Sequence, residues 1–136
     1  MSKKTYPVDY KSLAEIGEFV AQAAKKTGFK GNELYKIETA VDEACSNIIE
    51  HAYHGGADEK IVINVKPLPD RITIQISDFG LPFDLNNANK PDVKASLDER
   101  ENHGLGIYFI KEWMDLVDYK TRNGINTLTL VKFLKD

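Results

Sequence analysis

A carboxylate and an amide stand one helical turn apart in the segment VDEACSNIIEHAYHGG, residues 41–56. Glu43 and Asn47 are separated by four positions, so their side chains are neighbours if the segment is helical. A carboxylate placed in this way can accept the proton of an attacking hydroxyl group. An amide oxygen beside it is a hard ligand that suits Mg²⁺. The same spacing also fits an ordinary solvent-exposed helix face, so the pair needs further groups to define a site.

A second candidate group lies in ISDFGLPFD, residues 76–84, where an alternating segment stops. Asp78 at the end of a predicted strand can accept a hydrogen bond from an exocyclic amine, such as that of adenine. Gly80 would let the backbone approach a flat ring closely. A simple Asp/Gly turn explains the same residues without any ligand.

A third candidate group is HGLGIYFI, residues 103–110, in which Gly104 and Gly106 open an apolar segment. Free backbone N–H groups at the start of a helix bind phosphate, and glycines leave room for it. The dinucleotide-binding fingerprint needs a strand directly before its glycines. Here the polar stretch 85–103 precedes them, so a dinucleotide site is not expected, and the length of that stretch favours a mobile lid.

Hydrophobic periodicity predicts the elements that must position these groups. Apolar residues at helical spacing predict one helix over 11–27 and another over 33–54, with Asn32 as its N-cap. Alternation of apolar and polar residues predicts an antiparallel hairpin over 61–76. The remaining predicted elements are a short first strand over 5–10, a helix over 104–115, and strands over 116–122 and 126–134. The expected fold is therefore α+β, a two-layer sandwich with helices on one face of a mostly antiparallel sheet.

Length and composition limit the class of protein. A chain of 136 residues suggests a single domain over 1–136. A net charge of −3 gives no basic footprint for nucleic acid, and no apolar run is long enough to span a membrane. The lysines near the start are not followed by the apolar stretch of a secretory signal, and the single cysteine, Cys45, fits a reducing cytoplasm.

The order of the three groups resembles that of the GHKL (histidine kinase-like) ATPases. The segment DEACSNIIEHAY is similar to the N-box of that superfamily, DFGLPFD to its G1 box and HGLGIYFIKEWMD to its G2 box. This resemblance implies the Bergerat ATPase fold. Within the superfamily, the chain resembles the anti-sigma-factor serine/threonine kinases of bacterial partner-switching systems. This narrower resemblance rests on the short length, on the segment DFGLPFD and on the ending NGINTLTLVKF.

The resemblance implies roles for particular residues. Glu43 would be the general base, Asn47 a ligand of Mg²⁺ and ATP, and Asp78 with Gly80 would bind adenine. Gly104 and Gly106 would bind phosphate, and Thr127 or Thr129 in the last strand would assist adenine. The chain departs from the family at two places. Asn126-Thr127 replaces the usual Gly-Thr pair. The family often carries an arginine close before the first of these glycines, whereas the nearest one here is Arg100, four residues before Gly104.

The resemblance also implies partners. The family members bind ATP and Mg²⁺, hold a sigma factor, phosphorylate a serine or threonine of a small STAS-domain antagonist, and often form homodimers. Two alternatives remain open: a non-catalytic nucleotide-dependent binding module of the same fold, and a stand-alone ATPase domain related to sensor histidine kinases.

Overall fold

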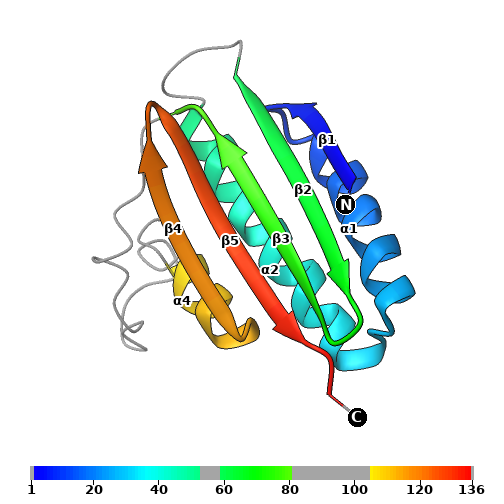
Figure 1. Ribbon diagram of the computed structural model, residues 1–136. Helices are drawn as coiled ribbons and strands as arrows, with labels where there is room; N and C mark the ends of the chain where they lie inside the picture. Colours follow the sequence, from blue (N-terminus) through cyan, green and yellow to red (C-terminus); the bar gives the residue numbers. More distant parts are fainter. Residues whose placement is uncertain (1, 53–58, 81–104, 136) are drawn as a thin grey trace.

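The computed structural model describes residues 2–52, 59–80 and 105–135. Within these ranges the elements follow one another along the chain as strand, two helices, hairpin, helix and hairpin (Figure 1). They are β1 (Ser2–Pro7), α1 (Ser12–Thr27), α2 (Gly31–Ala52), β2 (Lys60–Leu68), β3 (Arg71–Asp78), α4 (Leu105–Trp113), β4 (Leu116–Arg122) and β5 (Ile125–Phe133).

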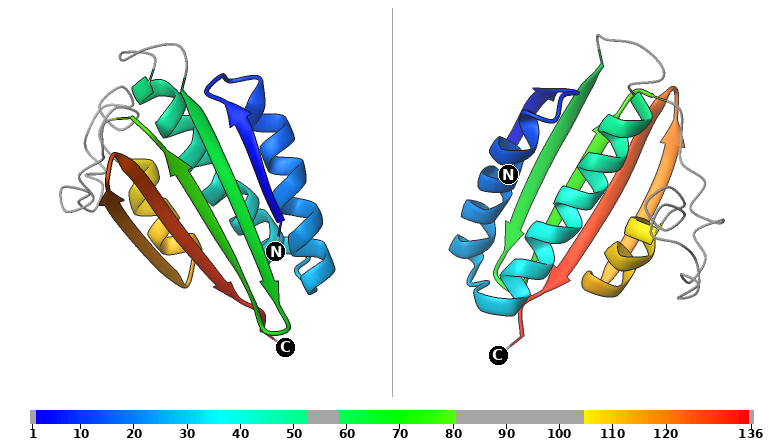
Figure 2. Two further views of the ribbon diagram at one scale, coloured as in Figure 1. Left: turned by 45° about the horizontal axis from the view of Figure 1, so that its top comes forward. Right: turned by 180° about the vertical axis from the view of Figure 1, so that it is seen from behind.

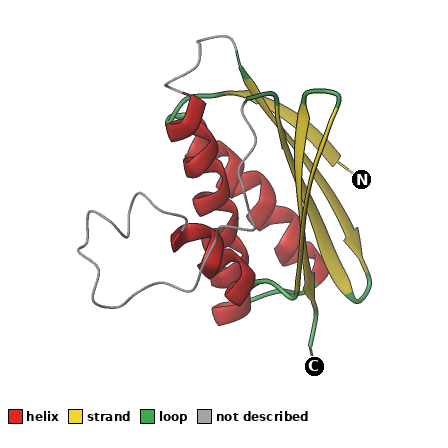
Figure 3. Cartoon of the chain, turned by 90° about the vertical axis from the view of Figure 1, so that its left-hand side faces the viewer, coloured by secondary structure: helices red, strands yellow, loops and turns green. Residues whose placement is uncertain are grey.

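The strands form one five-stranded sheet in the order β1-β2-β3-β5-β4, and each neighbouring pair is antiparallel. The hairpin β4–β5 turns at Asn123 and Gly124, whose φ angles of 54° and 79° match the two positive-φ positions of the tight turn that suits a twisted hairpin. The helices of the described ranges lie together on one face of the sheet (Figures 2 and 3). The predicted two-layer α+β fold is confirmed.

The helices follow the predicted apolar stripes. In α1 the buried residues include Ile16, Val20 and Ala24, and the helix ends at Gly28, whose φ of 119° is left-handed. The Gly28 N–H donates to the carbonyls of Ala24 and Lys25, as a C-terminal cap does. The prediction that Asn32 is the N-cap of the second helix was wrong. α2 begins at Gly31, so Asn32 lies within its first turn and not before it.

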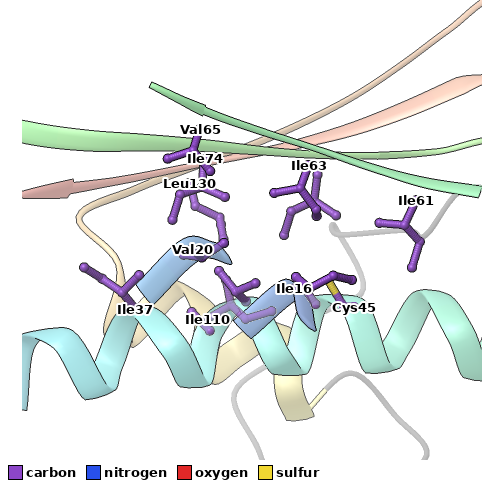
Figure 4. Packing of buried hydrophobic residues seen from close by; sticks show 14 of the residues in the cluster. Ile16, Val20, Ile37, Cys45, Ile61, Ile63, Val65, Ile74, Ile110 and Leu130 are labelled. Atoms are coloured by element: carbon purple, nitrogen blue, oxygen red, sulfur yellow. The ribbon is translucent and has the colours of Figure 1, made fainter. Parts of the chain in front are cut away.

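The core lies between the helices and the sheet, and isoleucine dominates it. Figure 4 shows Val65, Ile74 and Leu130 pointing from the sheet toward Val20 and Ile37 of the helices. Burying one such side chain contributes roughly 1.5–3 kcal/mol. The largest fully buried side chains are Ile16, Ile37, Ile49, Ile61, Ile63, Ile72, Ile74, Ile76, Ile110, Leu130, Val20 and Val41.

The alternation of buried side chains along β3 continues to the last residue of the strand, Asp78. Ile72, Ile74 and Ile76 are buried against the helices, and Asp78 occupies the next position on that face. Because side chains of a strand alternate between two faces, Asp78 points toward the helices.

The structure differs from the sequence prediction at the first strand. β1 begins at Ser2 rather than at residue 5 and ends at Pro7. It is an edge strand in which Tyr6 alone is buried, so its sequence carries no alternation of apolar residues. The predicted lid over 85–103, Gly104 and the end of the second helix at 53–54 lie outside the described residues. No helix in the described ranges is long and apolar enough to cross a membrane.

Candidate functional site

Asp78 ends β3 as a buried carboxylate, with 5% of its surface exposed. Its Oδ1 accepts a hydrogen bond of 2.9 Å from the backbone N–H of Gly80. The same oxygen accepts a second bond of 2.9 Å from the side-chain amide of Asn126. Among the described residues no donor contacts Oδ2, which leaves that oxygen as an open acceptor on the helix-facing side of the sheet.

Asn126 is a site residue that the sequence did not identify. It lies opposite Asp78 in the pairing of β3 with β5 and is 1% exposed. Its amide nitrogen donates to Asp78 and, at 2.9 Å, to the carbonyl of Gly80. Its carbonyl oxygen accepts a bond of 2.9 Å from the hydroxyl of Thr121. The only sequence signal was the departure from Gly-Thr at this point of the chain.

Thr127 and Thr129 lie on the other face of the sheet. Thr127 pairs with Ser77, and the two hydroxyl oxygens are 3.2 Å apart. Thr129 pairs with Gln75, whose amide donates to its hydroxyl. Neither threonine shares a face with Asp78, whose partner on β5 is Asn126, and a role of Thr127 or Thr129 in adenine binding stays a prediction.

Gly80 is enclosed by two carboxylates. A Cβ at this position would lie 3.3 Å from Oε2 of Glu59 and 3.4 Å from Oδ1 of Asp78. Glu59 stands directly before β2 and is half-buried. A side chain at position 80 would therefore contact both carboxylates, and the predicted place of Gly80 beside a flat ring stays a prediction.

Glu43 and Asn47 lie one turn apart on α2, and both are half-buried. They stand at the edge of the buried face of α2, beside Ala40 and Ala44, rather than opposite that face. Burial raises the pKa of the Glu43 carboxyl above its ordinary value, and the charge of Asp42 adds to the effect. A carboxyl whose pKa is raised in this way is a better proton acceptor than an ordinary glutamate.

The end of β3 lies close to this stretch of α2. Burial raises the pKa of the Cys45 thiol, and the charges of Asp42 and Asp78 raise it further. Asp78 is thus near enough to Cys45 for its charge to act on the thiol. β3 contacts α2, and Cys45 stands between Glu43 and Asn47 in the sequence of that helix.

The third predicted group is described in part. α4 begins at Leu105, so Gly106 is its second residue, and Gly104 lies outside the described residues. The predicted helix over 104–115 is confirmed over Leu105–Trp113, with Gly106 inside it rather than before it. The first N–H groups of a helix have no partner within the helix and carry partial positive charge. They are suited to a phosphate group.

These residues fit an adenine nucleotide with a divalent ion. Oδ2 of Asp78 is an acceptor for an exocyclic amine, and Gly80 adds no side chain beside it. Asn47 offers one amide oxygen, the kind of single protein ligand that Mg²⁺ uses when nucleotide phosphates supply other ligands.

Comparison with known families agrees with this geometry. The profile of the family described as the histidine kinase-like ATPase domain matches residues 6–132. Because this match spans most of the chain, the chain belongs to the histidine kinase-like (GHKL) ATPase family.

Within that family the chain is similar to serine-protein kinases. The serine-protein kinase RsbW of Bacillus cereus (strain AH187) is 30% identical over 133 residues, which cover 95% of this chain and 82% of that protein. The predicted resemblance to the anti-sigma-factor kinase branch is confirmed at this level of similarity.

Two solved structures share the fold. The RsbU and RsbW domains of Rv1364c from Mycobacterium tuberculosis match with a TM-score of 0.65 at 11% identity, over 100% of this chain and 34% of that one. The SiaB–SiaC complex from Pseudomonas aeruginosa matches with a TM-score of 0.60 at 16% identity, over 98% of this chain and 90% of that one. The chain spans about a third of the Rv1364c structure.

Proposed function

We propose that the chain is an ATP- and Mg²⁺-dependent protein serine/threonine kinase of the anti-sigma-factor type. Its substrate is a STAS-domain antagonist, and it sequesters a sigma factor or a similar regulator. The observation that carries this proposal is the half-buried Glu43, with its raised pKa, one turn from Asn47. A carboxylate whose pKa is raised is suited to accept a proton, which supports a catalytic role over a binding role alone.

Each residue has one task in the proposed reaction. Asp78 accepts a hydrogen bond from the adenine amine through Oδ2, and Gly80 lets the ring approach. Gly104 and Gly106 donate backbone N–H groups to phosphate oxygens, together with the first turn of α4. Asn47 would be among the ligands of Mg²⁺, and the bound ion would supply neutralisation of the phosphate charge.

Glu43 takes the proton of the acceptor hydroxyl. The hydroxyl oxygen then forms a bond to the γ-phosphorus of ATP, the bond from that phosphorus to the β–γ bridging oxygen breaks, and ADP leaves with the electron pair. Such phosphoryl transfer depends mostly on positioning and on neutralising charge. A positioned base typically contributes about 10²–10⁴ in rate.

The proposed partners and location follow from similarity. Relatives named serine-protein kinases support a protein acceptor, and the matched SiaB structure was solved as a complex with SiaC. A buried free thiol at Cys45 is compatible with the cytoplasm, where we place the protein. A homodimer is part of the same proposal, and its test is the mass of the protein in solution.

Labelled ATP and a candidate STAS-domain protein test the reaction. We expect acid-stable label on the acceptor, since phosphoserine and phosphothreonine survive acid. Acid-labile label would instead indicate a phosphohistidine and a relative of the sensor kinases, as the family description allows. ATP-dependent binding of the partner without label would indicate a binding module.

A further inference from the structure

We infer that Asn126 is a positioning residue that sets the preference for adenine by holding Asp78 in one orientation. This inference deepens the proposed nucleotide-binding function and rests on it. Asn126 takes no direct part in the proposed chemistry. It acts through the carboxylate that would contact the base.

The hydrogen bonds fix the orientation of the Asn126 amide. Its neighbours Asp78 Oδ1 and the Gly80 carbonyl oxygen only accept hydrogen bonds, so the amide nitrogen must face both of them. Its two N–H groups are then both used, at 2.9 Å each. The remaining carbonyl oxygen accepts the hydroxyl proton of Thr121, also at 2.9 Å.

The same bonds fix the orientation of Asp78. Oδ1 accepts from two donors, Gly80 N–H and the Asn126 amide, which leaves Oδ2 as the oxygen that can meet a ligand. Asp78 is 5% exposed and Asn126 is 1% exposed, so water does not compete freely for these bonds. A carboxylate held in this way loses little side-chain entropy when a ligand binds.

The held carboxylate distinguishes purines by their donors. Adenine presents an amine that donates to Oδ2. Guanine presents a carbonyl oxygen at the same ring position, which would face the carboxylate as a second acceptor and leave both without a proton between them. Without the Asn126 bond, Asp78 can rotate, and its preference for the amine should weaken.

The test compares two nucleotides in matched variants. ATP carries the amine, whereas purine riboside 5′-triphosphate lacks it and is otherwise the same ligand. The variants are Asn126→Ala, the similarly shaped Asn126→Leu, which loses both donors without adding a charge, and Thr121→Val, which loses only the outer bond of the chain. Ser77→Ala is the control, because it removes a hydroxyl from the same strand on the opposite face. Calorimetry gives the affinities, and melting curves confirm that each variant is folded.

We expect Asn126→Ala and Asn126→Leu to lose about tenfold in ATP affinity, the scale of one hydrogen bond to a charged group. Their affinity for purine riboside triphosphate should change by less than about twofold, and Thr121→Val should show a smaller loss confined to ATP. An equal loss for both nucleotides would overturn the inference, since a merely structural role lowers both. Unchanged ATP affinity in Asn126→Leu would also overturn it. If the unaltered protein bound neither nucleotide, the proposed function itself would fail.

Discussion

Lys132 Nζ, on β5, donates a hydrogen bond of 2.7 Å to the carbonyl of Trp113, the last residue of α4. The lysine is 3% exposed, and its ammonium group also lies 3.1 Å from Oε2 of Glu33 near the start of α2. One buried cation therefore joins the end of α4 to the beginning of α2. The opposite end of α4 carries the proposed phosphate site, so this anchor helps to fix the helix that presents it.

Lys132→Met should destabilise the fold by about 1–3 kcal/mol, because the Trp113 carbonyl and Glu33 lose their buried partner while the aliphatic stem is kept. Denaturant unfolding measures the change. Lys120→Met, at an exposed lysine of β4, is the control and should change stability by less than about 0.5 kcal/mol.

The effect of Lys132→Met should depend on pH. The contact with Lys132 is the main cause that lowers the pKa of Glu33, with Lys36 contributing. A carboxyl whose folded pKa is lowered stabilises the fold above its ordinary pKa, and this contribution is lost as the pH falls through the folded pKa. The difference in stability between the two proteins should therefore shrink in acid. A difference that stays constant down to acid unfolding would contradict the role given to Glu33.

Gly80→Ala should separate stability from nucleotide binding. The new Cβ would lie 3.3 Å from Oε2 of Glu59 and 3.4 Å from Oδ1 of Asp78. We therefore expect the free energy of unfolding to fall by about 1 kcal/mol. Adding Glu59→Ala should recover most of that stability, because it removes the neighbour on one side. ATP affinity should stay low in the double variant, since the Cβ still occupies the space of the base. Full recovery of affinity would show that Gly80 is not beside the ring.

The helices and strands could be predicted from the sequence, whereas the full set of residues in the site could not. Helix stripes such as Ile16, Val20 and Ala24 and the alternation in β3 are local patterns, and the structure has them. Which residue faces Asp78 depends on the register of β3 against β5, two strands far apart in the chain. A shift of one residue moves a side chain to the other face, and this is the difference between Thr127 and Asn126.

Buried polar residues are the second feature that the sequence does not predict. Lysine is almost never fully buried, so nothing in the alternating segment of β5 predicts that Lys132 lies inside. Its partners come from α2 and α4, and only the folded arrangement brings them together.

Cys45 should react with a thiol reagent only when the protein opens. The side chain is fully buried, and burial is the main cause that raises the pKa of the thiol, so almost no accessible thiolate is present in the folded state. Labelling should be slow in buffer and fast in denaturant. Saturating ATP with Mg²⁺ should slow it further, because a ligand that binds the folded state lowers the population of open molecules. Rapid labelling in buffer would contradict the burial, and an unchanged rate with nucleotide would count against binding.

Glu43→Gln should remove phosphoryl transfer while leaving nucleotide binding nearly intact. The amide keeps the size of the side chain but cannot accept the hydroxyl proton, so transfer to the acceptor should fall by about 10²–10⁴. ATP affinity, measured by calorimetry, should change by less than about threefold, since the group acts on the acceptor and not on the base. Glu50→Gln, an exposed carboxylate on the same helix, is the matched control and should keep full activity.

The pH dependence of transfer tests the same assignment. Burial and the charge of Asp42 raise the pKa of Glu43, and a general base must be unprotonated to act. The rate should therefore fall, as the pH is lowered, at a pH above the ordinary glutamate pKa of 4.5, and Glu43→Gln should lack this fall in its residual rate. Because the folded state disfavours the charged carboxylate, Glu43→Gln should also be at least as stable as the unaltered protein at neutral pH. Transfer that persists at the full rate in Glu43→Gln would assign the base to another residue.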